Sequence, residues 1–592
     1  MANFKLKYLN FSLCLIVILF ITSALSSTIK TKSFLIVYPP DNAVISNDKT
    51  FILGTNYSKN DLLINNDKIK INYLGFFAKV VDLKPGLNTF RINCSSDSYS
   101  LIVNHPQNPN NDFAPDSITP NENMAIKAGS TIHFSILAKP ASKISLILNN
   151  KIFGLYPQGA GVKLSTQYGK SKVSPNKLIK YALDYKVSDS DKFNSTHFKI
   201  VIDNNINPII FNSKTTISIL HNDIYAQTND ANTVVRTSPN GSRTTSLDKN
   251  VKICIIGYYG DEYCIKYTSQ KHVWINKKYL NFLPLNEYNP ITAVPRTINI
   301  DSLGNYDFIK IPIETNLPYE IDQKLNPNQL DLTLYGAKAN IEWITNSNEN
   351  KLKIIKYVNF VQINDESLKI TIHLKSHRQW GYFAQYKDNC LYLFCKQPIV
   401  INDDLKGLKI CLDPGHGGSE NGAIGLSGIK ESELNLNITQ KVKEILENHG
   451  AKVFITRSDN STYVDLYDRV NFAINNNCDI LLSIHNNSLP DGQDPLNESG
   501  TSTYWYHIQA VELAKSIKNG IINSTGFNDY GTRFQSLALI RSPNMLSVLA
   551  EIGFVINPDD LSNLINPEFQ DKIAQGIYIG LSSYLQGNRN DH

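Results

Sequence analysis

The sequence predicts a multidomain protein in which several all-β modules precede a C-terminal α/β domain with a mostly parallel or mixed sheet flanked by helices. The 592 residues suggest about four domains, at roughly 150 residues each. From about 33 to 400, short runs alternate apolar and polar residues between Asn, Asp, Gly and Pro, which is typical of strands and turns. From about 407 to 586, apolar strands alternate with amphipathic helices, which is an α/β pattern.

Composition narrows the functional class. The chain is 42% hydrophobic and 19% charged, which fits globular domains and excludes general disorder. The net charge of +5 is too small for a nucleic-acid binder, which needs a concentrated basic patch. Tyr and Phe, at 30 and 25, far outnumber the 3 Met residues, and this favours sheet.

The first 27 residues predict a secretory signal peptide. Lys5 and Lys7 precede an apolar run from about 11 to 21, and small residues follow at about 23–27. The alternative is a retained membrane anchor, but the run is shorter than the roughly 20 residues that a spanning helix needs. We therefore expect a monomer that is exported to the periplasm, cell wall or extracellular space, without stable membrane insertion after cleavage.

Seven of the 8 cysteines lie beyond this predicted leader. An odd, sparse set does not predict a disulfide framework. Cys254 and Cys264 flank a predicted hairpin and could face each other, so the sequence leaves this one disulfide open.

Four β modules are expected before the α/β domain. The first covers 33–105 and ends at a Pro- and Asn-rich linker, 105–116. The second covers 117–222 and reads as a β-sandwich whose middle is unclear. The third and fourth cover 223–284 and 292–399.

Three of these modules resemble known domains. The first is similar to immunoglobulin-like modules of cell-envelope enzymes. The third, with VVRTSPNGSR, a Gly260-Asp261 turn and a VWI motif, resembles bacterial Src-homology-3-like domains. The fourth, with LDLTLYGA and RQWGY, resembles the AMIN-type domains that accompany cell-wall amidases. The resemblances imply binding to wall glycan or peptide, by analogy of fold. The alternative is that Trp274 and Trp380 of these motifs are core residues.

Two histidines end strands of the α/β domain. The strand at 408–413 runs into Pro-Gly-His-Gly-Gly, which carries His416, and the apolar strand at 479–485 ends in His485. Glu431 lies between them at the start of a helix with apolar residues at helical spacing. Functional groups converge outside the carboxyl ends of strands in such sheets. Two His and one carboxylate make a known catalytic zinc set, with a fourth position left for water.

Each candidate also has an ordinary structural explanation. His416 could be a turn residue and His485 a strand-end residue, while Glu431 could be a carboxylate that the helix dipole favours. Glu433 and Glu420 are rival ligands in the same segment.

A fourth candidate, Glu551, lies among apolar residues of the strand SVLAEIGF. A buried carboxylate is costly, so such a group usually has a partner or a task. The alternative to a task is an ion pair, for which Arg541 is available.

The segment 407–586 resembles the catalytic domain of zinc-dependent N-acetylmuramoyl-L-alanine amidases. The matching stretches are DPGHGG, GIKESELNLN, ITRSD, LYDRVNFAINN, LLSIHNN, SGTSTYWY, LALIRSPNMLSVLAEIGFVINPDD and FQDKIAQGIYIGL. The resemblance implies Zn²⁺ as cofactor and peptidoglycan, with its glycan strands and stem peptides, as substrate. By motif, His416, Glu431 and His485 take the zinc-ligand positions and Glu551 that of the catalytic glutamate. Glu431 is preferred to Glu433 because it is the first acidic residue of KESEL.

The sequence departs from the family pattern in one position and leaves some roles open. Asn486 follows the second histidine, where relatives often have a small residue. Arg457, Arg469 and Arg541 match recurrent positions and fit substrate contacts or structural roles equally. Between about 504 and 539 there is one helix-like stretch, so we expect no helix that blocks the metal. The alternatives to an amidase are a catalytically inactive wall-binding scaffold and a zinc peptidase or deacetylase that acts on peptidoglycan.

Overall fold

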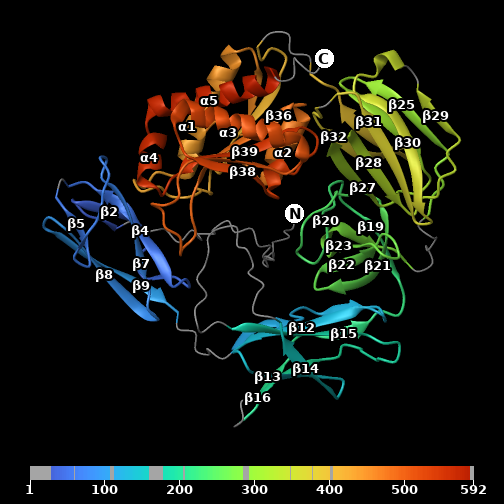
Figure 1. Cartoon of the computed structure of the whole chain (residues 1–592), viewed down its shortest axis with the longest axis horizontal. Coiled ribbons are helices and arrows are strands. Elements are labelled where there is room, and N and C mark those ends of the chain that lie inside the picture. Colours follow the sequence, from blue (N-terminus) through green and yellow to red (C-terminus); the bar gives the residue numbers. More distant parts are fainter. Residues whose placement is uncertain are drawn as a thin grey trace, which may run out of the picture.

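The computed structural model describes residues 29–58, 60–106, 113–158, 178–203, 207–284, 292–346, 349–376, 378–399 and 404–586. The predicted leader and most of the predicted linker lie outside these residues. β-Sheets fill the described chain as far as the fourth module, and one layered α/β domain follows (Figure 1). None of the described helices has the length and apolar character needed to span a membrane.

The first module consists of two sheets, in the orders β1-β2-β4-β7 and β3-β9-β8-β5-β6. Its strands are β1 (Ile29–Lys30), β2 (Phe34–Tyr38), β3 (Ala43–Val44), β4 (Lys49–Asn56), β5 (Leu62–Ile64), β6 (Asp67–Lys68), β7 (Phe76–Asp82), β8 (Gly86–Cys94) and β9 (Asp97–His105). Fully buried Phe34, Ile52 and Phe77 pack together in its core.

The second module has one sheet of seven strands, in the order β10-β12-β15-β14-β13-β16-β17. Its strands are β10 (Phe113–Thr119), β12 (Thr131–Ala138), β13 (Lys143–Leu148), β14 (Lys151–Pro157), β15 (Ile179–Lys186), β16 (Phe198–Asp203) and β17 (Ile209–Asn212). The middle of this module, which the sequence left unclear, falls largely outside the described residues.

The sheet of the third module also includes two strands from the range 117–222, which the sequence assigned to the second module. β11 (Met124–Ile126) pairs with β18 (Ile217–Ile219) and with β21. The remaining strands are β19 (Ile224–Thr228), β20 (Val235–Arg236), β21 (Lys252–Tyr259), β22 (Glu262–Lys266), β23 (His272–Asn276) and β24 (Leu280–Phe282). Gly257 permits this pairing, because a Cβ there would lie 2.7 Å from the Ala125 oxygen.

The fourth module has two sheets, in the orders β29-β25-β26-β33-β32 and β27-β28-β31-β30. Its strands are β25 (Thr297–Leu303), β26 (Tyr306–Pro312), β27 (Tyr319–Leu325), β28 (Asn328–Tyr335), β29 (Trp343–Asn346), β30 (Ile355–Asn364), β31 (Ser367–Leu374), β32 (Tyr382–Lys387) and β33 (Cys390–Lys396). One continuous hydrophobic core joins the third and fourth modules.

The α/β domain is built on a six-stranded sheet in the order β35-β34-β36-β39-β37-β38. The strands are β34 (Lys409–Pro414), β35 (Lys452–Ile455), β36 (Ile480–Asn487), β37 (Thr501–Trp505), β38 (Asp529–Phe534) and β39 (Leu546–Phe554). The first four strands of this order are parallel, and β37 is antiparallel to β39. The sheet is therefore mixed and mostly parallel.

Helices cover both faces of this sheet. They are α1 (Glu431–Asn448), α2 (Leu466–Asn475), α3 (Val511–Thr525), α4 (Pro558–Leu564) and α5 (Pro567–Gln586). Helices α1, α3 and α5 contribute to one core and α2 to the other (Figure 1). The helix that the sequence indicates between 504 and 539 is α3, which packs against α5 and β37.

The fourth module is fixed to the α/β domain by buried contacts. Trp380, which is fully buried, belongs to the hydrophobic core of the α/β domain and packs edge-on against Tyr584. Lys396 forms a buried ion pair of 2.6 Å with Asp479. The RQWGY motif therefore serves as an interface in this structure.

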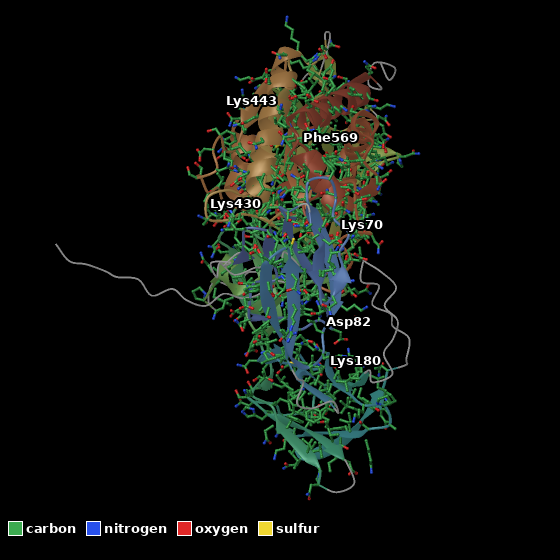
Figure 2. All side chains as sticks on the ribbon, turned by 90° about the vertical axis from the view of Figure 1, so that its left-hand side faces the viewer. Lys70, Asp82, Lys180, Lys430, Lys443 and Phe569 are labelled. Carbon is green, nitrogen blue, oxygen red and sulfur yellow. The ribbon has the colours of Figure 1, made fainter. Side chains whose placement is uncertain are left out.

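The first module docks on the α/β domain through strands that are buried on both faces. Successive residues of a strand point to opposite sides. Ile52 faces the interior of the module, whereas its neighbours Phe51 and Leu53 join the core of the α/β domain. Figure 2 shows the module in blue directly beneath that domain, with Lys70 and Lys430 labelled near the boundary.

Hydrogen bonds from the first module reach three segments that follow β34, β36 and β39. Thr55 Oγ1 donates to the Leu426 oxygen at 2.7 Å. The Asp491 carboxylate accepts from Tyr38 Oη at 2.7 Å and from Thr50 Oγ1 at 2.6 Å. On the third segment, Asn72 Nδ2 donates to the Pro558 oxygen at 2.8 Å. We call this set of contacts the loop clamp.

We predict that Asp491→Ala destabilises the first module, because the Tyr38 and Thr50 hydroxyls lose their acceptor. The expected loss in free energy of unfolding is about 2 kcal/mol. Urea denaturation, with hydrogen exchange of the β4 and β7 amides as the probe, measures this loss. Glu444→Ala, at an exposed position of α1, is the control and should change nothing. Equal stability of the two variants would show that the clamp contributes little.

Candidate metal centre

The structure brings His416, Glu431 and His485 together at the carboxyl edge of the sheet. One ligand atom from each lies within 4.8 Å of the others, and no other such group of three occurs among the described residues. His416 Nε2 lies 3.3 Å from Glu431 Oε2, and His485 Nδ1 lies 3.1 Å from Glu431 Oε1. The two imidazole centroids are 5.0 Å apart. Three residues separated by up to 69 positions thus share one small site.

A tight turn after β34 sets the position of His416. Its backbone is left-handed, with φ of 59°. The preceding Gly415 is required by close packing, because a Cβ there would lie 2.2 Å from the His485 ring. Arg469 Nη2 donates to the His416 oxygen at 2.8 Å, and Arg457 Nη2 donates to the Gly415 oxygen at 2.8 Å. The turn is therefore held by two arginines from other elements.

These arginines have structural roles. Arg457 and Arg469 are 3% and 2% exposed, and Arg469 pairs with fully buried Asp413 at 2.8 Å. Burial alone would raise the pKa of Asp413, but the Arg469 charge and hydrogen bonds hold it below its usual value. The sequence did not identify Asp413, although an Asp at the end of an apolar strand and an Arg beside Val470 on the inner face of α2 were usable signals.

Glu431 opens α1 and is held by three polar neighbours. Its carboxylate accepts from the Ala423 N–H at 2.9 Å, the Asn486 N–H at 3.2 Å and Asn435 Nδ2 at 3.2 Å. Burial alone would raise its pKa, yet His416 and His485 hold this pKa well below the usual value. Glu431 is therefore an anion at neutral pH. The side chain of Asn486, the departure from the family pattern, donates from Nδ2 to Asn435 Oδ1 at 2.8 Å and so holds the amide that contacts Glu431.

The rival carboxylates are not in the cluster. Glu420 is exposed, and Glu433 is half-buried on α1. Among the described residues, neither shares the convergence of ligand atoms seen for Glu431.

Glu551 lies beside the cluster on β39, directly opposite His485 on β36. Its Oε2 is buried and has no hydrogen-bond partner among the residues that the structure describes. Burial, and then the Glu431 charge, raise the pKa of Glu551 well above its usual value. Within the described residues it forms no ion pair with Arg541, so the alternative of a structural pair is not what the structure shows.

This donor set fits a divalent cation. Two imidazoles and a carboxylate are the ligands that zinc takes in catalytic sites, with one position left open. His485 Nε2 is buried without a partner, and the Glu431 carboxylate already contacts both rings. The three side chains would hold the ion, and Glu551 lies on the neighbouring strand, opposite His485.

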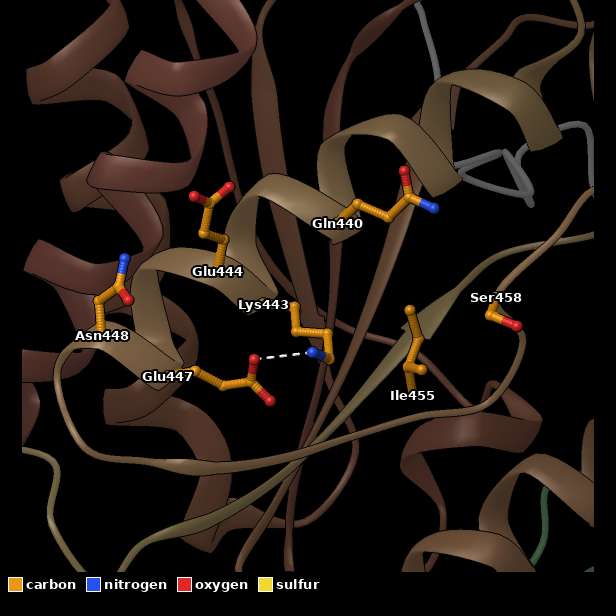
Figure 3. A pocket seen from close by; sticks show the side chains of 7 residues that line it. All are labelled: Gln440, Lys443, Glu444, Glu447, Asn448, Ile455 and Ser458. Atoms are coloured by element: carbon orange, nitrogen blue, oxygen red, sulfur yellow. Dashed lines mark hydrogen bonds and ion pairs between the residues drawn. The ribbon is translucent and has the colours of Figure 1, made fainter.

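Other features of the structure are separate from this centre. A surface hollow of about 410 Å³ lies between α1 and β35, and Figure 3 shows its lining, with Lys443 bonded to Glu447. None of the four candidate residues lines it. Cys254 and Cys264 are both free thiols, and Cys264 lies opposite Gly257.

Comparison with known proteins places this centre in a family. The family model described as N-acetylmuramoyl-L-alanine amidase matches residues 410–583. The probable cell wall amidase LytH of Staphylococcus epidermidis is 32% identical over 235 residues, which is 39% of this chain and 77% of LytH. The N-acetylmuramoyl-L-alanine amidase LytC of Bacillus subtilis is 35% identical over 191 residues, 32% of this chain and 37% of LytC.

A solved structure also matches this segment. The catalytic domain of CwlV, an N-acetylmuramoyl-L-alanine amidase from Bacillus (Paenibacillus) polymyxa, is 32% identical. The match covers 30% of this chain and 98% of that domain, with a TM-score of 0.29.

We predict that His416→Ala lowers the affinity for Zn²⁺ by at least about 100-fold, because it removes one of three donors. Metal analysis after dialysis against Zn²⁺ measures this. As an independent readout, zinc at 100 times the wild-type Kd should stabilise the wild type by about 2.7 kcal/mol and the variant by no more than about 0.4 kcal/mol. His272→Ala, at an exposed position of the third module, is the control. Equal zinc content in both variants would remove His416 from the ligand set.

Proposed function

The chain belongs to the cell wall N-acetylmuramoyl-L-alanine amidase family, and on that premise we propose that it hydrolyses the amide bond between N-acetylmuramic acid and L-alanine of the stem peptide. The observation that supports this most is the convergence of His416, Glu431 and His485 beside Glu551. The predicted leader supports export, so the substrate we propose is peptidoglycan outside the cytoplasm.

Zinc is the cation we propose for the three ligands. When bound, it supplies a water with a pKa near 7 and a positive charge beside the scissile carbonyl. The chain's own part is to hold the three donors in place. Arg457 and Arg469 fix the His416 turn, and the Asn435 amide and Asn486 N–H orient Glu431.

Glu551 is the proposed proton carrier. Its free Oε2 accepts the proton of the attacking water and passes it to the nitrogen of the leaving amine. Its pKa is raised by burial and by Glu431, and a cation among the ligands offsets the Glu431 charge. A carboxyl with a pKa brought nearer to neutral can both take and give a proton, which typically contributes about 10²–10⁴-fold in rate.

Two alternatives lead to different products. An inactive scaffold would be expected to lack a metal ligand or the catalytic glutamate, but this chain has all three ligand residues and Glu551. A zinc peptidase or deacetylase could use the same residues on the same polymer. The wall-binding roles of the β modules stay predictions.

We predict that Glu551→Gln retains zinc and loses about 10²–10⁴-fold in kcat, because the amide cannot accept the proton. Release of free N-terminal L-alanine from purified peptidoglycan measures the rate, and metal analysis measures zinc. Glu433→Gln is the matched control on α1 and should keep full activity. A Glu551→Gln enzyme with the wild-type rate would exclude the proposed role.

Product analysis by mass spectrometry tests the reaction itself. We expect intact stem peptides with a free L-alanine amine and glycan strands with a free lactyl carboxyl group. Release of acetate would indicate a deacetylase, and an internal peptide cut would indicate a peptidase. The absence of any product in zinc-loaded protein would favour the scaffold.

A further inference from the structure

Two arginines from different domains meet beside one tyrosine of α2. Arg243 belongs to the third module, in the segment between β20 and β21, and Arg541 belongs to the segment before β39. Arg243 Nη1 donates to Tyr467 Oη at 3.3 Å. Arg541 Nη1 donates to the Ser536 oxygen at 3.0 Å, and its guanidinium lies close enough to interact electrostatically with both Arg243 and Tyr467. We call these two arginines and Tyr467 the arginine pair site.

Neighbouring residues of the α/β domain fix the backbones of both arginines. Tyr506 Oη donates to the Arg243 oxygen at 3.1 Å. His507 Nε2 bonds the Arg541 oxygen at 2.8 Å, and burial lowers the pKa of His507 to about 4, so this ring is neutral. The Tyr506 and His507 ring centroids are 5.0 Å apart. The arrangement is therefore built from both domains and does not depend on two loose surface side chains.

The two charges have no acidic partner. Among the described residues, neither guanidinium lies within 4.0 Å of a carboxylate, in contrast to Arg469 with Asp413. Burial, and then the charge of Arg243, lower the pKa of Arg541 to about 10. Like charges held together in a partly buried place repel each other, and a bound anion would offset that cost. Both arginines are only half-buried, so an anion from solvent can reach them.

Exposed aromatic residues link the arginine pair site to the metal centre. Gly418, two residues after His416, packs so closely on Tyr463 that a Cβ there would lie 2.6 Å from the Tyr463 nitrogen. Tyr463 and, four residues later, Tyr467 are each 49% exposed. Arg469, two residues after Tyr467 on α2, donates to the His416 oxygen at 2.8 Å, so the arginine pair site lies at the end of α2 that contacts the His416 turn.

We propose that Arg243 and Arg541 form an anion subsite that binds a carboxylate of the stem peptide while the amide bond lies at the metal centre. The inference rests on the proposed function and adds a residue from outside the α/β domain to the substrate site. The planar guanidinium fork matches a carboxylate with two parallel hydrogen bonds. A peptide stem ends in a carboxylate and can carry others on acidic residues, so the substrate class offers the required group. The third module is then part of substrate recognition.

Binding of the released stem peptide tests the subsite without catalysis. Calorimetry compares a peptide with free carboxylates and the same peptide with every carboxylate converted to a carboxamide. The wild type should bind the carboxylate peptide at least about 10-fold more tightly than the carboxamide peptide, as expected for a hydrogen bond to a charged group. Arg243→Gln and Arg541→Gln should each lose this preference. Lys249→Gln removes one positive charge at an exposed position of the same module and should keep it.

Hydrolysis of the matching muramoyl-peptides adds a second readout. Arg243→Gln should raise KM for the carboxylate substrate by about 10-fold with kcat unchanged, and should hydrolyse the carboxamide substrate like wild type. Unchanged carboxamide hydrolysis also shows that the variant is folded.

Two results overturn the subsite: a wild type that binds both peptides equally, or an Arg243→Gln variant that keeps the wild-type preference. A protein that prefers the carboxylate peptide yet releases no L-alanine amine from any substrate would retain the subsite and refute the amidase function alone.

Discussion

The buried ion pair between Arg469 and Asp413 is the interaction on which the centre depends. It joins α2 to the end of β34, and the same guanidinium reaches the His416 oxygen. Removing one member of such a pair leaves an uncompensated buried charge and typically costs about 3–5 kcal/mol. His416 has a left-handed backbone in a glycine turn, so it would not keep its place without this support. The position of a proposed metal ligand thus depends on a residue 53 positions later in the chain.

Contacts from the β modules also hold the segments around the candidate metal centre. The loop clamp ties the first module to the segments that follow β34, β36 and β39. The fourth module inserts Trp380 into the core of the α/β domain, and the third module brings Arg243 against α2. Three of the four β modules therefore contact the α/β domain, the first and fourth through buried hydrophobic residues and the third through half-buried Arg243.

Sequence patterns predicted the individual elements well, because they rest on local periodicity. The strand before His416 and the helix that opens at Glu431 occur where expected, and the apolar strand that carries His485 continues two residues past it, to Asn487. Gly415 is required for more than the turn, because only a residue without a Cβ lets the His485 ring pack against it. The roles of Arg457 and Arg469 stayed open, because an arginine in a motif has the same appearance whether it faces substrate or a buried carbonyl.

By itself, the sequence determined the order of β modules and α/β domain and the identity of four candidate residues. These follow from hydrophobic periodicity, from residue chemistry and from the resemblance to the amidase motifs, all of which are local to short stretches of sequence. Tertiary structure alone decided that the ligand atoms of His416, Glu431 and His485 meet, that Glu551 Oε2 is buried beside them with no partner among the described residues, and that Cys254 and Cys264 are free thiols. It also decided which modules touch the catalytic domain. These outcomes depend on distances between residues far apart in the chain, and no local pattern encodes such distances.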